Sequence, residues 1–578
     1  MLDRRQILTL GAQSALLAAS PAVARAAQAA PAARNAAPTG FFNVRAYGAV
    51  GDGTTIDSPA IQRAIEAAST AGGGVIHFPA GVYASYSIRL RSHISLYLDH
   101  GATILAAPIS QSGIGYDAPE PQGDGESYQD YGHNHWHNSL IWGDGLHDFS
   151  IEGPGLIWGK GLSRGYNHEP GLPEVTAPGA GNKAIALKNC YNVTLRDFSI
   201  LQGGWFGILA TGVDNLTIDN LKIDTNRDGM DIDCCRNVRI SNCYVNSPAD
   251  DGICLKADHA LGSSKQTEFV TITNCYVSGC WEEGTLLDGT YKRRPQGGGT
   301  GRIKFGTESD GGFRNITISN CVFEGCQGLA LETVDGAILE DITVTNISMR
   351  DIISAPIFLR LGRRMRAPDG RPIGTLKRVI ISNIVCSDCS PRLGSVISGI
   401  PGHYVEDVKI SNIQVLHKGG GTKADAAFQP LEAEDVYPEP GMFLSESRHG
   451  NGRGQNGQFV PEGQGRGAAG GRGPAPGQQA GRGPGGPPPV MHSMPSHGFY
   501  VRHVKGIQFD NIEVKAEKED QRPLFVLDDV QGADFFRIQG SRTAGVPVFA
   551  LHDVSDFDVH MCAGVPDTQL AKVDKKTL

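Results

Sequence analysis

Long hydrophobic runs are scarce in this chain of 578 residues, and aromatic residues make up only 7% of it. Beyond the N-terminal segment, no stretch approaches the roughly 20 consecutive apolar residues that a membrane-spanning helix needs. A positive charge balance is also lacking, because the formal net charge is −9. Nucleic-acid binding requires a basic stripe that displaces counterions. The composition therefore argues against a nucleic-acid or membrane partner for the mature protein.

The N-terminus reads "MLDRRQILTLGAQSALLAASPAVARAAQAA", with Arg4 and Arg5 paired before a short apolar run. Ala24 and Ala26 then form an Ala-x-Ala-like cleavage site. These features predict a twin-arginine export signal over residues 1–26, followed by a linker over residues 27–40. A frayed amphipathic helix is the alternative. We expect the mature protein to be periplasmic or secreted.

The chain has twelve cysteines, which would suggest disulfides in an exported protein. Their placement favours another explanation, since four of them directly follow an asparagine and so occupy one equivalent position in a repeat. We expect those four to form a buried stack of small, soft side chains. Bridges between Cys275 and Cys280 or between Cys386 and Cys389 remain open. The four stacked positions are Cys190, Cys243, Cys275 and Cys321.

A short pattern recurs along the chain, for example as "NVTLRDFSI", "NLTIDNLKI", "NVRISNCYV" and "NITISNCVF". Each copy has an alternating strand, an Asn or Asp, and another short strand. The first turn positions are 23 and 22 residues apart, which is typical of one coil of a parallel β-helix. The turn residues are Asp197, Asn220, Asn242, Asn274, Asn320, Asn346, Asn383, Asn412 and Asn511.

The repeat predicts an all-β protein, a parallel β-helix or solenoid. Because each coil contacts only its neighbours, one core can run along the axis of a single domain over residues 41–562. Residues 563–578 are predicted to be a C-terminal tail. We expect the protein to be a monomer.

An amphipathic helix is predicted within residues 54–71. Ile61, Ile65 and Ala68 fall on one face after the cap-like Asp57. A β-helix must cover its open end to avoid presenting unpaired strand edges. This helix is the predicted N-terminal cap.

Residues 444–489 are rich in glycine, proline and arginine, in "LSESRHGNGRGQNGQFVPEGQGRGAAGGRGPAPGQQAGRGPGGPPP". The stretch has too few apolar residues to offset the entropy of ordering it. We predict a disordered insertion with no catalytic role.

Two acidic stretches, "TNRDGMDID" and "NSPADDGICLK", lie one coil apart. Asp228 comes eight residues after Asn220 and Asp250 eight after Asn242, so a step of 22 residues predicts that they stack in one register. The Asp-Gly pairs could be turn formers only. That alternative does not explain why the Asp250–Asp251 pair is stacked on another carboxylate, where like charges repel and raise a pKa. We therefore predict a functional carboxylate cluster of Asp228, Asp250 and Asp251.

The cap segment, the coil repeat and the two acidic motifs resemble those of glycoside hydrolase family 28, which contains polygalacturonases and rhamnogalacturonases. The resemblance implies a right-handed parallel β-helix, an acidic plant cell-wall polysaccharide or oligosaccharide as substrate, inversion at the anomeric carbon and no cofactor. Asn226 and Asp228 match the first motif, and Asp250 and Asp251 match the second. The resemblance implies that Asp250 is the general acid and that Asp228 and Asp251 hold and deprotonate the attacking water.

Two departures from that family concern the substrate. The family's histidine is replaced by Gly301 or Arg302, and its Arg-Ile-Lys falls on a segment with Ala330 and Glu332. Arg302 and Lys304 lie one coil earlier, so they are candidate substitutes for binding the substrate, although they could equally face solvent. The departures favour another pectic linkage, such as the galacturonate–rhamnose backbone.

Other candidate residues are a histidine row and a buried arginine. In "YGHNHWHNSLIWG", His133, His135 and His137 alternate, so His135 is a candidate wall of the sugar site and the row a possible metal site. Arg360 lies within an apolar strand, where it is either a structural ion pair or a reader of a substrate carboxylate. No metal is expected.

Two other function classes remain open. A polysaccharide lyase on this fold would bind Ca²⁺ with the aspartates and use Arg302 or Lys304 as a base. A non-catalytic carbohydrate-binding β-helix would tolerate the missing histidine. The sequence favours a hydrolase.

Overall fold

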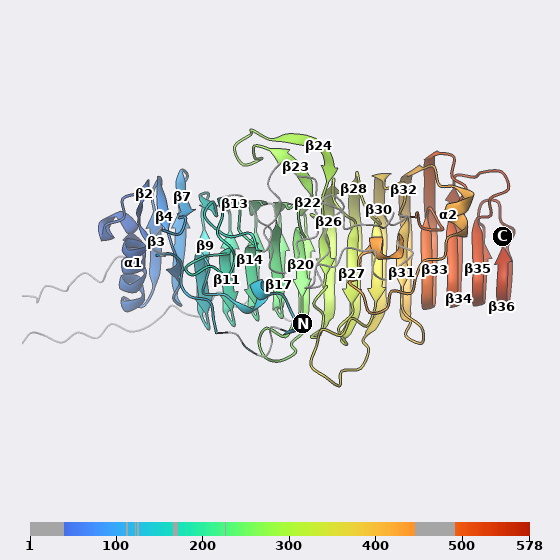
Figure 1. Ribbon diagram of the computed structural model, residues 1–578, viewed down its shortest axis with the longest axis horizontal. Coiled ribbons are helices and arrows are strands. Elements are labelled where there is room, and N and C mark those ends of the chain that lie inside the picture. The colour runs from blue at the N-terminus through green and yellow to red at the C-terminus, as the bar shows by residue number, and fades with distance from the viewer. Residues whose placement is uncertain are drawn as a thin grey trace, which may run out of the picture. The chain divides into compact units, whose positions relative to one another are not determined.

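The repeated strands wind into a stack of coils, seen from the side in Figure 1. The computed structural model describes residues 40–110, 114–121, 123, 127–165, 171–225, 227–444 and 492–578. The predicted export signal (1–26) lies outside this part, as do the linker (27–40) except for its last residue and the insertion (444–489) except for its first. That first residue, Leu444, is buried within η4 (Pro440–Leu444), so it belongs to the fold.

Each coil contributes one strand to each of three parallel ladders. The first ladder contains β5 (Ile88–Arg89), β8 (Ile141–Asp144), β11 (Lys183–Lys188), β14 (Phe206–Thr211), β17 (Asp228–Asp233), β20 (Ile253–Lys256), β25 (Ile303–Phe305), β27 (Leu329–Thr333), β29 (Ile357–Leu361) and β31 (Ser395–Ser398). The second contains β1 (Phe41–Asn43), β3 (Gly74–Phe78), β6 (Ile94–Leu98), β9 (His147–Glu152), β12 (Tyr191–Arg196), β15 (Asp214–Asp219), β18 (Arg236–Ser241) and β21 (Thr267–Thr273). The third contains β2 (Asp52–Ile56), β4 (Gly81–Ser85), β7 (Ala102–Ala106), β10 (Leu156–Trp158), β13 (Ser199–Leu201), β16 (Lys222–Asp224), β19 (Tyr244–Asn246) and β22 (Tyr276–Ser278).

Later coils have longer strands that continue through more than one ladder. The second and third ladders merge in β26 (Phe313–Glu324), β28 (Ile338–Arg350), β30 (Thr375–Cys389) and β32 (Val405–Gly419). The last coils are formed by β33 (Phe499–Lys518), β34 (Phe525–Gly540) and β35 (Phe549–His560). A separate antiparallel hairpin of β23 (Cys280–Glu283) and β24 (Lys292–Gly298) projects from the stack (Figure 1). The fold is thus the predicted parallel β-helix.

The corner between the second and third ladders repeats in nearly every coil, and we call it the asparagine corner. Its residues have left-handed backbone angles, with φ between 53° at Asn220 and 72° at Asp197. Asn and Asp tolerate these angles better than most residues because their side chains bond locally. The side-chain amides also bond from coil to coil, as when Asn346 donates to Asn320 and accepts from Asn383, both at 3.0 Å. The predicted turn positions are confirmed.

Both ends of the stack are covered. Helix α1 (Ser58–Thr70) packs on η1 (Val44–Tyr47) and the first strands, with Ile61, Ile65 and Ala68 fully buried, as predicted for the cap. Asp57 does not cap the helix with its side chain, which accepts hydrogen bonds from the N–H groups of Val50 and Gly51 instead. At the other end the predicted tail is largely a strand, β36 (Thr568–Thr577), which pairs antiparallel with β35. This pairing covers the last parallel edge.

The twelve cysteines are all free and buried. Cys243, Cys275 and Cys321 stack at the asparagine corner, because Tyr244 pairs with Tyr276 and Tyr276 with Val322. Placing Cys190 in the same stack was wrong. It lies at the corner between the first and second ladders, where its backbone carbonyl accepts a hydrogen bond from the N–H of Asp214. An asparagine also precedes the turn there, so the local sequence does not distinguish the two corners.

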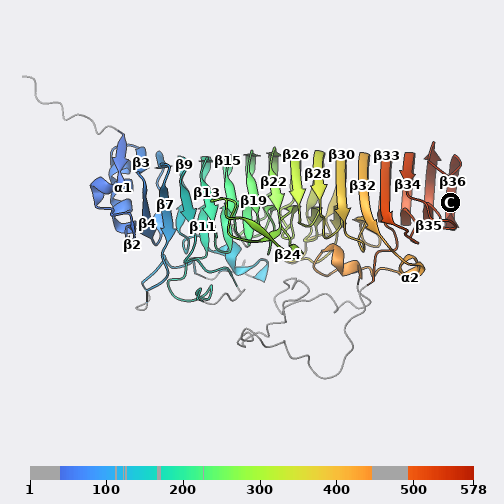
Figure 2. The same ribbon diagram turned by 90° about the horizontal axis from the view of Figure 1, so that it is seen from above.

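Segments from distant parts of the chain cover the outer face of the first ladder in two places. Trp136 and Val175 pack over β11 and β14. Met442 and Phe443 pack over later strands from β27 onward. Figure 2 shows the chain around α2 (Lys423–Ala427) on the same side of the stack as the loops of the early coils. Strands β17, β20 and β25 lie between the two covers. Among the described residues, no helix is long and apolar enough to cross a membrane.

Candidate active site

Three carboxylates gather on the first ladder between the two covers. Asp228 begins β17, and Asp250 and Asp251 lie in the turn before β20. One oxygen of each lies within 4.8 Å of an oxygen of the other two. Asp228 and Asp251 are 3% exposed, whereas the side chain of Asp250 is 33% exposed. Asp250 is therefore the member of this carboxylate cluster that a substrate reaches most easily.

The stacking of the acids differs from the prediction. Met230 pairs with Ile253, and the N–H of Gly229 bonds the carbonyl of Asp251, so the step between β17 and β20 is 23 residues. In the preceding strands β16 and β19, by contrast, Asp224 pairs with Asn246 at a step of 22. The second coil thus has one extra residue in its turn.

That extra residue changes the position of each acid in the ladder. Asp251, not Asp250, lies above Asp228 in the ladder, so the predicted register of Asp228 with Asp250 was wrong. Asp250 belongs to the lengthened turn, which explains why it is the exposed member of the pair. The prediction that all three acids lie together is nevertheless borne out by their positions.

Arg227 holds two of these carboxylates, although sequence reasoning assigned it no role. Its guanidinium lies 3.5 Å from an oxygen of Asp228 and 3.3 Å from one of Asp250. The same group lies over the Trp205 ring, 4.7 Å from its centroid. Such a desolvated cation between two acids stabilises their charged forms. The sequence signal for this role was the position of the arginine directly before Asp228.

Arg302 and Lys304 face the carboxylate cluster, as their alternation predicts, but not as free substrate cations. They are 1% and 2% exposed. Arg302 Nε lies 3.0 Å from Asp251, and Lys304 Nζ lies 3.4 Å from the other oxygen of the same carboxylate. The predicted direct contact with substrate is therefore contradicted by burial. These two side chains instead fix Asp251 and its charge.

A segment far along the sequence completes this ion network. Glu439, just before η4, pairs with Arg302 and lies 3.3 Å from Lys304 Nζ. The Tyr437 hydroxyl lies 3.4 Å from the same Lys304 nitrogen. Sequence reasoning missed both residues, because they are separated from Arg302 and Lys304 by more than 130 residues and no repeat pattern marks them.

The three carboxyl groups differ in their pKa. Burial raises the pKa of Asp228 well above its usual range, and the charges of Asp250 and Asp231 add to the effect. Burial also raises the pKa of Asp250, against the pull of Arg227. For Asp251, burial alone would raise the pKa, but Lys304 and Arg302 outweigh it and lower the value. The pKa of the accessible Asp250 is therefore shifted toward the protonated form, whereas the pKa of the buried Asp251 is shifted toward the ionised form.

A second buried network lies beside the carboxylate cluster on β17 and β20. Lys256 Nζ lies 3.0 Å from Glu308 and 3.6 Å from Asp231. His133 lies 3.2 Å from Asp231 and 3.6 Å from Asp258. These groups neutralise one another beneath the surface, so they position the strands rather than contact a substrate.

Arg360, another predicted substrate residue, does not join the site. Arg360 is 1% exposed and donates to Ser398 Oγ and to the carbonyls of Gly399, Glu432 and Ala433. It therefore anchors a covering segment, and both an ion pair and carboxylate recognition are contradicted. Asn226 lies outside the described residues.

The histidine row is not extended, because η3 (Tyr131–Asn134) interrupts it. His133 is buried beside Asp231, and His137 lies 3.5 Å from Glu120. His135 is 1% exposed, hydrogen-bonds the Tyr131 carbonyl and stacks on the Tyr131 ring. The three imidazoles thus have separate partners, so neither a shared metal site nor direct sugar contact by His135 fits.

The carboxylate cluster itself has the oxygen ligands that Ca²⁺ or Mg²⁺ prefers. Its charge, however, is already offset by Arg227, Arg302 and Lys304. This neutralisation weakens the attraction for a divalent cation. The arrangement is better suited to proton transfer and to holding a water molecule.

Comparisons with known proteins bear on the fold and the family of the chain. The family model described as "Rhamnogalacturonase A/epimerase, pectate lyase-like" matches residues 41–135, and "Right handed beta helix region" matches residues 174–293. A probable polygalacturonase of Vitis vinifera is 28% identical over 230 residues, which is 36% of this chain and 43% of that protein. The Arabidopsis thaliana probable polygalacturonase At3g15720 is 25% identical over 48% of this chain and 59% of its own length. The matches thus span about half the length of these curated relatives.

Solved structures support the fold. The Yersinia enterocolitica family 28 exopolygalacturonase has a TM-score of 0.56 and 16% identity, covering 87% of this chain and 79% of that one. The exopolygalacturonase of Thermotoga maritima has a TM-score of 0.52 and 20% identity, covering 65% and 87%. The fold is a right-handed parallel β-helix. The resemblance to the polygalacturonases of glycoside hydrolase family 28 is confirmed.

Proposed function

We propose that the chain is a glycoside hydrolase that cleaves a pectic polysaccharide or oligosaccharide. The observation that carries this proposal is the carboxylate cluster, in which an exposed Asp250 lies beside the buried Asp228 and Asp251. The polygalacturonases among the curated relatives supply the substrate class. No cofactor is required by this chemistry.

Exposure, together with the directions of the pKa shifts, supports a role for each acid. Asp250 reaches the surface and has a raised pKa, which favours its protonated form, so in this proposal it protonates the departing glycosidic oxygen. Asp251 stays ionised between Arg302 and Lys304, so it orients the attacking water and accepts its proton. Asp228, directly below Asp251 in the ladder, provides a second oxygen contact for that water. Water then adds to the anomeric carbon as the glycosidic bond breaks.

The proposed substrate specificity follows from three cations that are not free to bind a substrate carboxylate. Arg227, Arg302 and Lys304 are buried and paired with protein carboxylates. A galacturonate carboxylate at the cleavage position would have to displace one of those acids. We therefore favour a linkage with a neutral sugar at this position, such as the galacturonate–rhamnose backbone. The match of residues 41–135 to the family model described as "Rhamnogalacturonase A/epimerase, pectate lyase-like" supports this choice.

Incubating the purified protein with defined pectic fragments tests the reaction class. A hydrolase releases reducing ends, with or without chelator. A lyase forms an unsaturated product that absorbs ultraviolet light and disappears with chelator, and a carbohydrate-binding protein forms neither product. Comparing homogalacturonan with rhamnogalacturonan fragments tests the substrate, and faster cleavage of homogalacturonan would contradict a neutral sugar at the cleavage position.

Inversion at the anomeric carbon, which the family resemblance implies, has its own test. One oxygen of each carboxylate lies within 4.8 Å of one oxygen of the other two, whereas the carboxyl groups of inverting enzymes are typically about 6.5 to 9.5 Å apart. In the proposed mechanism three carboxyl groups take part, so a distance rule derived for two carboxyl groups does not apply directly. Proton NMR of the first-formed product distinguishes the two anomers. Retention of configuration would make one aspartate a nucleophile.

Export by the twin-arginine pathway is also proposed, supported by Arg4 and Arg5 before the short apolar run. Replacing both arginines by lysine should leave the precursor in the cytoplasm of a host with this pathway. Unchanged export would argue against it.

A further inference from the structure

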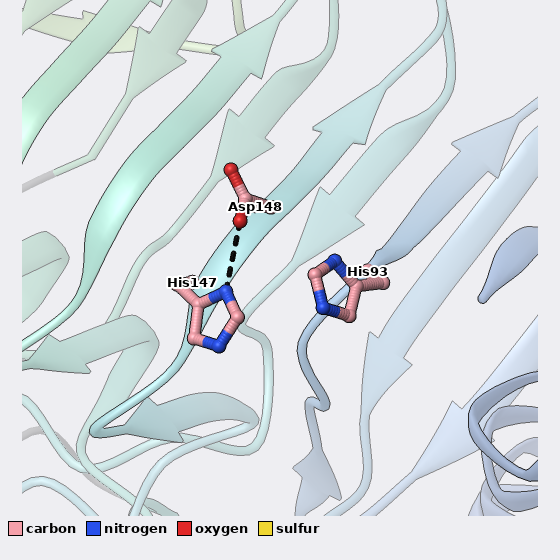
Figure 3. Close-up of side chains that lie close together, drawn as sticks. All are labelled: His93, His147 and Asp148. Carbon is pink, nitrogen blue, oxygen red and sulfur yellow. Dashed lines mark hydrogen bonds and ion pairs between the residues drawn. The ribbon is translucent and has the colours of Figure 1, made fainter. Parts of the chain in front are cut away.

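Two histidines and an aspartate meet at the corner between the first and second ladders, near the N-terminal end of the stack (Figure 3). His147 begins β9, Asp148 follows it, and His93 directly precedes β6. Ser95 pairs with Ser150, so His93 lies opposite Asp148 one coil away. The His93 N–H also bonds the carbonyls of both His147 and Asp148. We call these three residues the histidine cluster.

The backbone and neighbours hold this cluster in place. His93 and Asp148 have φ values of 64° and 53°, the left-handed angles of the corner. Asn192 Nδ2 donates to Asp148 Oδ1 at 2.9 Å. The His147 ring stacks on Tyr191 with 4.8 Å between centroids. The positions from which the side chains extend are therefore fixed by the coil, while their polar ends reach solvent.

The cluster replaces a ladder of amides that fills the same column in the next coils. There Asn215 donates to Asn192 at 2.7 Å, and Asn192 donates to Asp148. One coil further toward the N-terminus the column has His93, whose ring nitrogens have no hydrogen-bond partner among the described residues, while its ring packs edge-on against His147 at 4.8 Å. The ladder thus ends in an unused imidazole beside a second imidazole and a carboxylate.

We propose that His93, His147 and Asp148 bind a divalent transition-metal ion such as Zn²⁺. One ligand atom from each residue lies within 4.8 Å of the others. Ligands in a tetrahedral zinc site bind at about 2.0 to 2.2 Å and so lie roughly 3.4 Å apart. Small rotations of the exposed His93 and Asp148 side chains and of the half-buried His147 ring supply that contraction.

The donor set decides the class of ion. Two imidazoles and one carboxylate suit zinc, nickel or copper, whereas Ca²⁺ and Mg²⁺ prefer oxygen ligands only. His147 Nδ1 currently lies 2.8 Å from Asp148 Oδ2. On binding, the ion replaces the proton between these two atoms, so that His147 and Asp148 both become ligands. Three protein ligands leave at least one position for water.

Calorimetric titration of the full chain with Zn²⁺ tests this site, and Co²⁺ absorption reports its geometry. We expect one ion to bind, with an affinity that falls at least about 10- to 100-fold in His93→Ala and in His147→Ala. His403→Ala is the matched control, because His403 is an exposed histidine elsewhere on the β-helix, and it should bind Zn²⁺ as the wild type does. His93→Gln replaces His93→Ala in this titration if the alanine variant, without metal, has a lower melting temperature than the wild type.

Asp250→Asn separates this site from the carboxylate cluster. It should bind Zn²⁺ unchanged if the ion is at the histidine cluster. Wild-type stoichiometry and affinity in both histidine variants would overturn the proposal. Loss of the ion in Asp250→Asn alone would overturn it too, because the ion would then belong to the aspartates.

Discussion

The asparagine corner and the carboxylate cluster are parts of the same coils, yet they are built in opposite ways. At the corner, one residue type recurs with nearly the same backbone angle and bonds its copy in the next coil, as Asn346 does with Asn320 and Asn383. At the carboxylate cluster, successive coils present different side chains. In the column beside the cluster, Asp231, Cys254, Lys304 and Ala330 occupy one and the same position in β17, β20, β25 and β27.

The difference separates repetition from function. Neighbouring coils satisfy each corner by themselves, so any single corner adds a small and similar increment of stability. The carboxylate cluster instead depends on one-time contacts, in which Asp251 is held by Arg302 and Arg302 by Glu439. Changes there should be large and specific, and changes at the corner small and alike.

The largest expected effect is on catalysis. Asp250→Asn should lower kcat by about 10² to 10⁴, the usual contribution of a general acid, while the melting temperature stays unchanged because the side chain is partly exposed. Asp574→Asn, on the exposed side of β36, is the matched control and should leave both unchanged. Near-normal activity in Asp250→Asn would remove this residue from the mechanism.

The sequence anticipated the corner well because the corner is local. A step of 22 or 23 residues and an Asn or Asp with left-handed preference identify it within a single coil. The sequence also identified Asp228, Asp250 and Asp251 as neighbours. It gave no sign that Glu439 returns from a covering segment to pair with Arg302.

One extra residue explains the remaining error at the site. The turn from Asn246 to Gly252 is one residue longer than the turn from Asp224 to Gly229. Spacing measured from the asparagine corner cannot locate such an insertion within the coil. Similarly, the alternation of side chains along the strand placed Arg302 and Lys304 on the correct face. It could not predict that a distant segment of the chain covers that face.

The second effect is on stability. Arg302→Met leaves the buried Glu439 and Asp251 to share the single charge of Lys304. Removing one partner of a buried ion pair typically destabilises by about 3 to 5 kcal/mol, so the urea midpoint should fall clearly. Adding Glu439→Gln should recover part of the loss, since it removes one of the two carboxylates that then share Lys304. A midpoint equal to that of the wild type would mean that this network is not needed for folding.

A smaller effect is expected at the asparagine corner. Asn346→Ala removes two amide bonds and places alanine at φ 57°. The left-handed angle alone costs an ordinary residue about 1 to 2 kcal/mol, so the urea midpoint should fall less than for Arg302→Met. Asn346→Gly should recover part of the loss, because glycine adopts this angle freely. A loss as large as that of Arg302→Met would remove the distinction between the two regions.

The smallest effect concerns the β23–β24 hairpin, which contacts the third ladder just before the turns that carry the site. Asn246 Nδ2 donates to Glu282 at 2.6 Å and to Asp224 at 3.2 Å. Burial, together with the bond to the Asp224 carboxyl, raises the pKa of Glu282 to about 9. The docked hairpin therefore binds a proton that a free glutamate, with a pKa of about 4.3, would release.

This linkage has a definite sign. Docking is most stable below the pKa of the free glutamate and weakens as the pH rises from about 4.3 toward the docked pKa of about 9. Hydrogen exchange at β23 and β24, corrected for its intrinsic pH dependence, should therefore show less protection at pH 8 than at pH 5. Glu282→Gln should remove this difference, because the amide is neutral at every pH. Glu283→Gln, the exposed neighbour on the same strand, should retain it. Equal protection at both pH values in the wild type would mean that docking of the hairpin does not depend on the charge of Glu282. Repulsion between the Glu282 and Asp224 carboxylates would then not weaken docking at high pH.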